Sequence, residues 1–203
     1  MKIICLARNY VAHAKELNNP LPEKPLFFMK HENCIVRGNK PFFYPDFSSD
    51  IHYEVELVIR ISKVGKNIEQ KFAQRYYDKI GLGIDFTARD LQTEARENGA
   101  PWEIAKAFDY SAPLSELMPV SDFQDVNRIS FKLDLNGNTV QEGNSELMIF
   151  PVDVQLAYIS TFITLKTGDL LFTGTPAGVG PVKIGDHLEA YLEGKKMMDF
   201  FVK

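Results

Sequence analysis

The sequence predicts an α+β fold that is mainly β, with a few short helices. Residues 53–62 are rich in valine and isoleucine, which favour β-strands. Residues 131–135 alternate apolar and polar side chains and lead into Asn136-Gly137, a strong hairpin signal. The chain also contains 15 phenylalanines, which favour a β-rich core or an aromatic-lined interface. These observations outweigh the few segments that have helical spacing.

The elements follow from local signals along the chain. Strands are expected at residues 3–7, 26–30, 53–62 and 80–86, and helices at about 10–17, 68–79, 87–97 and 151–164, with mostly β structure from residue 128 onward. Asn9 is expected to cap the first helix, which the Asn18-Asn19-Pro20 stretch ends. Residues 87–90 have the form of a capping box for the third helix. Two similar turns, at 166–169 and 183–186, each lead into a strand.

Composition narrows the class of protein. The 203 residues suffice for one full core, and no repeat or linker divides them, so we expect one domain over 1–203. A net charge of −4 gives no basic surface typical of nucleic-acid binding. The apolar run at 3–7 is too short for a signal peptide or a membrane span. Two cysteines, Cys5 and Cys34, without paired-ligand spacing indicate a reduced, cytoplasmic protein and argue against a zinc–thiolate site.

An acidic cluster is the first candidate site. Glu54 and Glu56 stand at i and i+2 of the expected strand, so they point to one face, about 6.5–7 Å apart along the backbone. Asp85 ends the following apolar strand. Such carboxylates repel one another unless a cation lies between them, and Mg²⁺ or Mn²⁺ prefers oxygen ligands. The alternatives are a half-exposed strand with His52, Glu54 and Glu56 on a polar face, and an acid near a helix start.

His13 and Glu16 form the second candidate. At i and i+3 on a helix they share a face, and a carboxylate that orients an imidazole makes a general-base dyad. The alternative is a pair of surface residues. His31 and His187 fall in turn or strand-edge positions and are expected at the surface.

Two further segments carry candidate residues. Residues 174–180 contain three glycines and Thr175 after an apolar strand, a composition that can wrap backbone N–H groups around an anion, although most such loops are only tight turns. Lys106 lies in an apolar setting, either as a surface residue or as a buried cation facing the acidic cluster. Arg89 and Gln92, at i and i+3, are placed to point back towards the same cleft.

Taken in order, these segments resemble the fumarylacetoacetate hydrolase family over essentially the whole chain. The matching segments are Arg8-Asn9-Tyr10 with His13 and Glu16, Phe28-Met29-Lys30, the His-x-Glu-x-Glu-Leu run at 52–57, Asp85-x-Thr-Ala-Arg-Asp-x-Gln, Pro101-Trp102 with Lys106, Gln141-Glu142-Gly143, Met148-Ile149-Phe150, and Gly168-Asp169 followed by the glycine-rich loop. Each segment alone is weak, but together and in order they favour the functional interpretations over the alternatives above.

The resemblance implies a compact, barrel-like β-roll with a mixed sheet and short flanking helices, usually a homodimer. It implies Mg²⁺ or Mn²⁺ held by Glu54, Glu56 and Asp85, with His13 and Glu16 on a lid of about residues 9–25. The proline-rich end of this segment fits a lid and equally an ordinary loop. The chain is expected to begin directly with the catalytic domain. It is most similar to the acylpyruvate hydrolase and oxaloacetate decarboxylase branch.

The implied reaction is hydrolysis of a C–C bond in acylpyruvate-type 2,4-dioxo acids, with release of pyruvate, and also decarboxylation of oxaloacetate. Glu16 would orient His13, which deprotonates water, and Lys106 would neutralise developing charge. Thr175 is expected to hold the substrate carboxylate, and Arg8, Lys30 and Gln92 to contact the substrate. The alternatives are an isomerase or decarboxylase of 2-hydroxyhepta-2,4-diene-1,7-dioate and a non-catalytic module that binds a keto acid. No nucleic-acid or membrane partner is expected.

Overall fold

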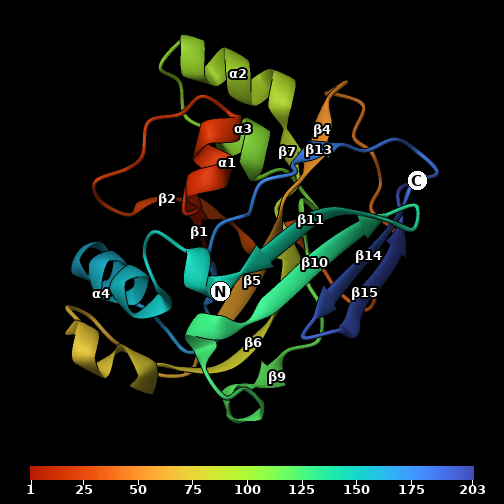
Figure 1. Cartoon of the computed structure of the whole chain (residues 1–203). Helices are drawn as coiled ribbons and strands as arrows, with labels where there is room; N and C mark the ends of the chain where they lie inside the picture. The colour runs from red at the N-terminus through yellow and green to blue at the C-terminus, as the bar shows by residue number, and fades with distance from the viewer.

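The computed structural model describes residues 1–203 and contains 15 strands and four α-helices. The largest sheet has the strand order β2 (Leu26–Lys30), β1 (Ile3–Ala7), β12 (Leu170–Phe172), β5 (Val55–Ile61), β6 (Tyr77–Ile84) and β9 (Met118–Pro119). A second sheet consists of β11 (Asn138–Asn144), β10 (Ser130–Leu135), β14 (His187–Leu192) and β15 (Lys195–Phe201). Figure 1 shows this second sheet lying across the front of the first.

Two small sheets complete the β structure. They are β13 (Gly180–Pro181), β4 (Ile51–Tyr53) and β7 (Thr87–Ala88), and the pair β3 (Ile35–Val36) and β8 (Ala112–Pro113). Among the named strands only β1–β12 and β3–β8 pair in parallel, and the other strand pairs are antiparallel. The mixed, mainly β class is therefore confirmed, and all four sheets are open, so no closed barrel forms.

Four helices lie on the outside of the sheets: α1 (Val11–Glu16), α2 (Arg89–Glu97), α3 (Glu103–Lys106) and α4 (Val152–Phe162). Figure 1 shows α1, α2 and α3 gathered at one side of the molecule, with α4 beside the short 3₁₀ turn at 70–75. None of the helices is long and apolar enough to cross a membrane.

Both faces of the large sheet are buried, which explains the nearly continuous apolar run of β5. Val55, Leu57 and Ile59 join the main hydrophobic core on one face, together with the inner face of the second sheet. Val58 joins a smaller core on the other face, with Ile3 and residues of β12. Because side chains alternate along a strand, Glu56 shares the face of Val58, on the side that α1, α2 and α3 cover.

Several expected elements are confirmed, including strands 3–7 and 26–30 and the helices at 87–97 and 151–164. In the hairpin between β10 and β11, Asn136 and Gly137 have φ of 52° and 79°, the left-handed values that a two-residue hairpin turn requires. The turns at 166–169 and 183–186 each end in an aspartate whose carboxylate accepts a hydrogen bond from the first backbone N–H of the turn.

Three local predictions are wrong. The helix expected at 68–79 is a 3₁₀ turn over Gln70–Arg75, because Tyr77 already pairs with Ile61 as the start of β6. Residues 87–90 form no capping box, because Thr87 and Ala88 are held in β7 against β4. Asn9 does not cap α1, since its side-chain amide donates to the carbonyls of Phe150 and Thr173 instead.

Candidate active site

The three carboxylates come together where β5 and β6 meet the helices. Glu54 lies between β4 and β5, so the strand expected at 53–62 is interrupted there. Asp85 follows β6, and its backbone N–H donates to the carbonyl of Glu54 at 2.8 Å, which extends the β5–β6 ladder by one bond. One oxygen from each of Glu54, Glu56 and Asp85 lies within 4.8 Å of the other two. All three side chains are buried, so the interpretation as a half-exposed polar face is wrong.

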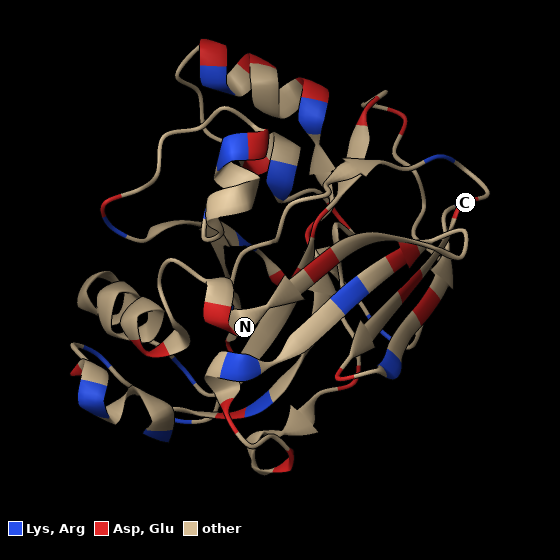
Figure 2. Ribbon diagram, viewed as in Figure 1, with Lys and Arg blue, Asp and Glu red and all other residues tan.

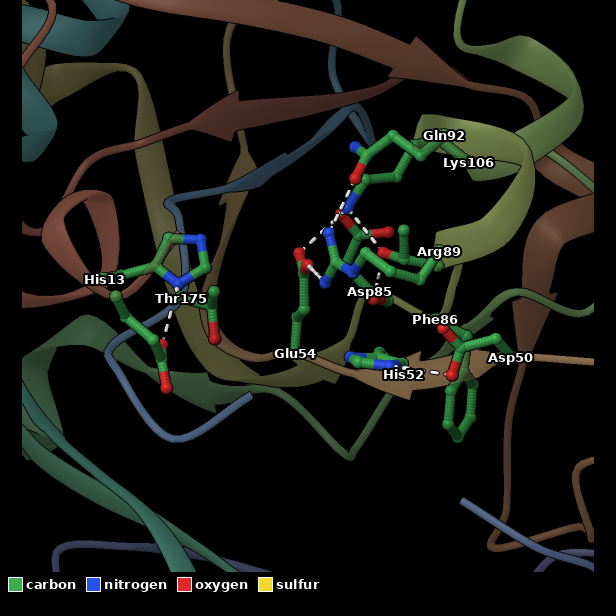
Figure 3. A network of polar contacts seen from close by, with 12 residues as sticks. His13, Asp50, His52, Glu54, Asp85, Phe86, Arg89, Gln92, Lys106 and Thr175 are labelled. Carbon is green, nitrogen blue, oxygen red and sulfur yellow. Dashed lines mark hydrogen bonds and ion pairs between the residues drawn. The ribbon is translucent and has the colours of Figure 1, made fainter. Parts of the chain in front are cut away.

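Three basic side chains neutralise two of these acids. Lys106 Nζ lies 2.8 Å from Glu54 Oε2 and 2.7 Å from Asp85 Oδ2, and Lys30 Nζ lies 2.8 Å from Asp85 Oδ1. Arg89 Nη2 lies 2.5 Å from Glu54 Oε1 (Figure 3). Burial raises the pKa of Glu54, but Lys106 and Arg89 outweigh it and hold this pKa well below its ordinary value.

Glu56 has no such partner. Its Oε2 accepts a hydrogen bond of 2.7 Å from the Gly174 backbone N–H, and no basic side chain pairs with it. Burial and then the charges of Asp85 and Glu54 raise its pKa well above the ordinary value. A hard divalent cation among these oxygens would relieve that repulsion, and three carboxylates match the ligand preference of Mg²⁺ and Mn²⁺. The residues present therefore fit such a metal.

Lys106 is buried rather than at the surface. Its ammonium also donates to Thr87 Oγ1 at 2.6 Å, which leaves it surrounded by oxygen atoms. Burial lowers the pKa of Lys106, but the charges of Asp85 and Glu54 outweigh this effect and raise the pKa above its ordinary value. The side chain therefore stays charged. Lys30 lies behind Asp85, where Ser111 Oγ accepts a hydrogen bond from its ammonium at 2.9 Å.

His13 and Glu16 lie on α1, which faces the acidic cluster (Figure 3). His13 Nδ1 is 3.5 Å from Glu16 Oε2. The imidazole is buried whereas Glu16 is exposed, so the interpretation as surface residues is wrong for His13 and holds for Glu16. Burial lowers the pKa of His13, although Glu54 and Glu16 oppose the shift. The ring is therefore neutral at pH 7 and able to accept a proton.

The glycine-rich loop at 174–180 binds two anions of the protein itself. Gly174 N–H donates to Glu56, and Gly178 N–H donates to both carboxylate oxygens of Glu16, at 3.1 and 3.2 Å. Gly178 has a φ of 97°, and a Cβ there would lie 2.1 Å from the carbonyl oxygen of Val140, so only glycine fits. The loop thus links α1 to the acidic cluster.

Thr175 lies on the same loop, between two strands. Its hydroxyl donates to the Val55 carbonyl at 2.9 Å and accepts from Gln141 Nε2 at 2.9 Å. The same Gln141 side chain accepts from Val55 N–H at 2.9 Å, so the loop is fixed to the start of β5. Gln141 therefore has a structural role in the site. The sequence indicated this residue only as part of the segment Gln141-Glu142-Gly143 that matches the family.

One cavity joins most of these groups. Its lining comprises Leu6, Ala7, Arg8, His13, Leu17, Asn19, Phe28, Glu54, Glu56, Asp85, Arg89, Gln92, Arg96, Trp102, Lys106 and Thr175. Eight of the ten candidate residues are among them, and the other two, Glu16 and Lys30, lie directly behind His13 and Asp85.

Sequence reasoning did not identify Arg96, Asn19 or Trp102 as lining residues. The signal for Arg96 was available, because Arg89, Gln92 and Arg96 follow at i, i+3 and i+7 on one helix face. Arg89 was expected to face the cleft, and it also donates to Gln92 Oε1 at 2.6 Å. Asn19 lies after α1, where no sequence pattern fixes the path of the chain.

Comparisons with known proteins agree with this geometry. A family model described as fumarylacetoacetate (FAA) hydrolase C-terminal matches residues 2–201. The chain is 41% identical over 194 residues to "Oxaloacetate decarboxylase, mitochondrial" of Dictyostelium discoideum, covering 95% of this chain and 89% of the relative. It is 38% identical over 201 residues to "Oxaloacetate tautomerase FAHD1, mitochondrial" of Mus musculus, covering 99% and 91%.

A solved structure is also similar. Fumarylpyruvate hydrolase from Pseudomonas aeruginosa, in complex with Mn²⁺ and pyruvate, has a TM-score of 0.95 and 37% identity, covering 100% of this chain and 89% of that chain. Both relatives above are named as mitochondrial, so a cytoplasmic location stays a prediction. The family model spans nearly the whole chain, and both relatives are more than 30% identical to it. The chain therefore belongs to the fumarylacetoacetate hydrolase family.

Proposed function

We propose that the chain is a divalent-metal-dependent enzyme that cleaves acylpyruvate-type 2,4-dioxo acids and releases pyruvate. The observation that carries the proposal is one cavity in which a neutral, buried His13 faces the buried carboxylates Glu54, Glu56 and Asp85. The named activities of the similar proteins, all on 2-oxo acids, support it.

Glu54, Glu56 and Asp85 would hold Mg²⁺ or Mn²⁺. When bound, the metal supplies a Lewis acid that favours negative charge on the 2-oxo group. Glu54 also depends on Arg89 and Lys106 for its position, since both donate to its carboxylate. A ligand set built in this way holds its geometry before substrate arrives.

His13 would act as the general base on water. Glu16 holds the imidazole from one side, and the Gly178 N–H in turn holds Glu16. As the water oxygen bonds to C4 of the substrate, its proton goes to His13. The C3–C4 bond then breaks, its electron pair passes to the pyruvate half as an enolate, and protonation of C3 gives pyruvate and a carboxylic acid.

Other residues of the cavity would bind substrate. Gln92 and Thr175 offer polar groups beside the acids, and the charged ammonium of Lys106 stabilises negative charge that develops there. Lys30 acts through Asp85, which it contacts from behind. Arg8 lies nearer the opening, where its side chain is half-buried.

A second candidate substrate is oxaloacetate, which the names of two relatives favour. Decarboxylation needs no attacking water, and tautomerisation moves only a proton between C3 and the 2-oxo oxygen. His13 is able to transfer that proton, so the same residues serve either reaction.

The proposal includes a homodimer and a lid made of about residues 9–25. The polar contacts of this segment to the rest of the cavity are few, and they include Glu16 with Gly178 and Asn19 with Arg96. Light scattering of the purified chain tests the dimer, which requires twice the monomer mass.

A substrate panel tests the function. Metal-loaded protein is given acetylpyruvate, fumarylpyruvate, oxaloacetate and 2-hydroxyhepta-2,4-diene-1,7-dioate, while pyruvate, CO₂ and enol absorbance are followed. Pyruvate and an equal amount of carboxylic acid from either acylpyruvate support the hydrolase. Reaction of oxaloacetate alone moves the assignment to decarboxylase or tautomerase, according to whether CO₂ appears. Turnover of the diene-dioate alone assigns the isomerase, and no turnover of any substrate contradicts an enzyme of 2-oxo acids.

A further inference from the structure

The charges of the cavity are segregated. The three acids lie in its buried part, where Lys30, Lys106 and Arg89 supply three positive charges, all of them in contact with Glu54 or Asp85. Two further arginines, Arg8 and Arg96, line the same cavity nearer to solvent. The outer part of the cavity therefore carries a positive charge that no acid of the lining cancels.

Arg96 belongs to α2, on the same face as Arg89 and Gln92. Its only side-chain hydrogen bond is to Asn19 Oδ1, at 3.1 Å, and it forms no ion pair. Asn19 is an uncharged partner, so it orients the guanidinium without neutralising it. Figure 2 shows that basic residues lie at both ends of α2, each beside acidic residues of the same helix.

Arg8 projects from the end of β1 and forms neither a side-chain hydrogen bond nor an ion pair. Its backbone has a φ of 56°, a left-handed value that is uncommon for a residue with a side chain. This turn places Arg8 at the cavity wall. Arg8 and Arg96 line the same cavity. Burial and then the charge of Arg96 lower the pKa of Arg8, in keeping with two like charges in that cavity.

Two unpaired guanidinium groups that repel each other form a good site for an anion. Arginine binds a carboxylate through parallel N–H donors, and a shared carboxylate would remove the repulsion between the two arginines. In the buried part, a divalent metal would leave the three acids and three bases with a surplus of two positive charges. The cavity thus suits a ligand that is anionic at both ends.

We propose that Arg8 and Arg96 form a subsite for a second, distal carboxylate, so that the preferred substrates are 2,4-dioxo acids with a carboxylate beyond the acyl group. This inference rests on the proposed function and names its substrate class. It makes fumarylpyruvate, which ends in a carboxylate, a better substrate than acetylpyruvate, which ends in a methyl group.

The test compares the variants Arg96→Gln and Arg8→Gln with the wild type on both substrates. We expect kcat/KM for fumarylpyruvate to fall roughly 10- to 100-fold in each variant, mostly through KM, because one charge-assisted hydrogen-bond partner is lost. For acetylpyruvate we expect a change below about two-fold in Arg96→Gln. Arg128→Gln is the matched control, since that arginine is exposed and far from the cavity lining. Arg96→Lys should restore part of the loss.

Equal losses on both substrates, or no loss on fumarylpyruvate, would overturn the subsite. If the wild type turns over neither substrate, the proposed function fails, and binding still tests the subsite. Calorimetry with Mn²⁺ present would then compare pyruvate, a monocarboxylate, with 2-oxoglutarate, a dicarboxylate. A selective loss of 2-oxoglutarate affinity in Arg96→Gln supports the subsite, and unchanged affinity for both ligands rejects it.

Discussion

Glu54 and Glu56 are two residues apart, yet their environments differ sharply. Two basic side chains contact Glu54 and lower its pKa, whereas Glu56 meets only a backbone N–H and two neighbouring acids, which raise its pKa after burial has done so. Without a metal, Glu56 is therefore the strained member of the cluster. It is also the residue whose charge a metal would most directly compensate.

Replacing Glu56 with glutamine should separate stability from metal binding. The amide oxygen of the variant can still accept the Gly174 N–H, and the repulsion from Asp85 and Glu54 disappears, so we expect the metal-free protein to unfold at an equal or higher temperature. The dissociation constant for Mn²⁺ should rise at least about 10-fold, since one charged ligand is lost. Calorimetry and thermal unfolding measure both. Glu142→Gln, at an exposed position, is the control. Unchanged Mn²⁺ affinity would remove Glu56 from the ligand set.

The pH dependence of turnover should follow His13. The neutral imidazole is the active form, so the rate is present above the pKa of His13 and lost as the pH falls through it. Because burial lowers this pKa, the acid limb should lie below pH 6.5. Glu16 raises the pKa, so Glu16→Gln should move the limb to lower pH and reduce kcat. Kinetics from pH 4.5 to 8 test this, with Glu23→Gln as an exposed control from the same segment. If the acid limb of Glu16→Gln moves to higher pH, the pairing of Glu16 with His13 is contradicted.

At the scale of elements, the loop at 174–180 connects parts of the site that lie far apart in sequence. It binds Glu56 of β5 through Gly174 and Glu16 of α1 through Gly178, and Gln141 of β11 holds Thr175. The proposed base and the proposed metal ligands therefore share one backbone support. A change in this loop should affect both.

Substituting Gly178 with alanine tests that support. The Cβ would meet the Val140 carbonyl oxygen at 2.1 Å and the backbone keeps a φ of 97°, so we expect a stability loss of about 1–3 kcal/mol and a lower kcat as Glu16 loses its donor. Gly185→Ala is a matched control, because Gly185 has the same φ but open space at its Cβ. Chemical denaturation and steady-state kinetics measure the two effects. Equal results for the two variants would mean that the contact with Val140 has no consequence.

At the scale of the whole molecule, the C-terminus closes the core behind the site. Phe42 is fully buried, stacks on Phe86 with ring centroids 3.9 Å apart, and pairs its backbone with the last residues of the chain. Phe86 directly follows Asp85. Core packing thus supports a candidate metal ligand from the opposite side.

Removing the Phe42 ring should destabilise the molecule strongly. We expect Phe42→Ala to cost about 3–5 kcal/mol of unfolding free energy, as large-to-small changes at buried aromatic positions do. Phe43→Ala is the neighbouring control, because that ring is 63% exposed, and it should change stability by less than about 0.5 kcal/mol. Urea denaturation measures the unfolding free energy of both variants. Similar losses would show that stacking on Phe86 is not a main source of stability.

The sequence predicted the mixed β class, most strand positions and the grouping of the three acids, because these depend on local alternation and on ordered motifs. It failed where tertiary contacts decide between alternatives. Tyr77 pairs with Ile61 instead of continuing a helix, and Asn9 bonds to distant carbonyls instead of capping α1. Helix spacing could have placed Arg96 beside Arg89 and Gln92, but its contact with Asn19, 77 residues away, depends on the path of the chain after α1.

The proposed function requires the buried carboxylates Glu54, Glu56 and Asp85 to form a catalytic metal centre for 2-oxo acids. The most direct test is pyruvate release from fumarylpyruvate and acetylpyruvate by metal-stripped protein, before and after Mn²⁺ or Mg²⁺ is returned. We predict negligible release without metal and full recovery with it, and no recovery in Asp85→Asn. An undiminished rate of pyruvate release in the stripped protein would contradict the metal centre. No release from either substrate after the metal is restored would contradict the proposed reaction.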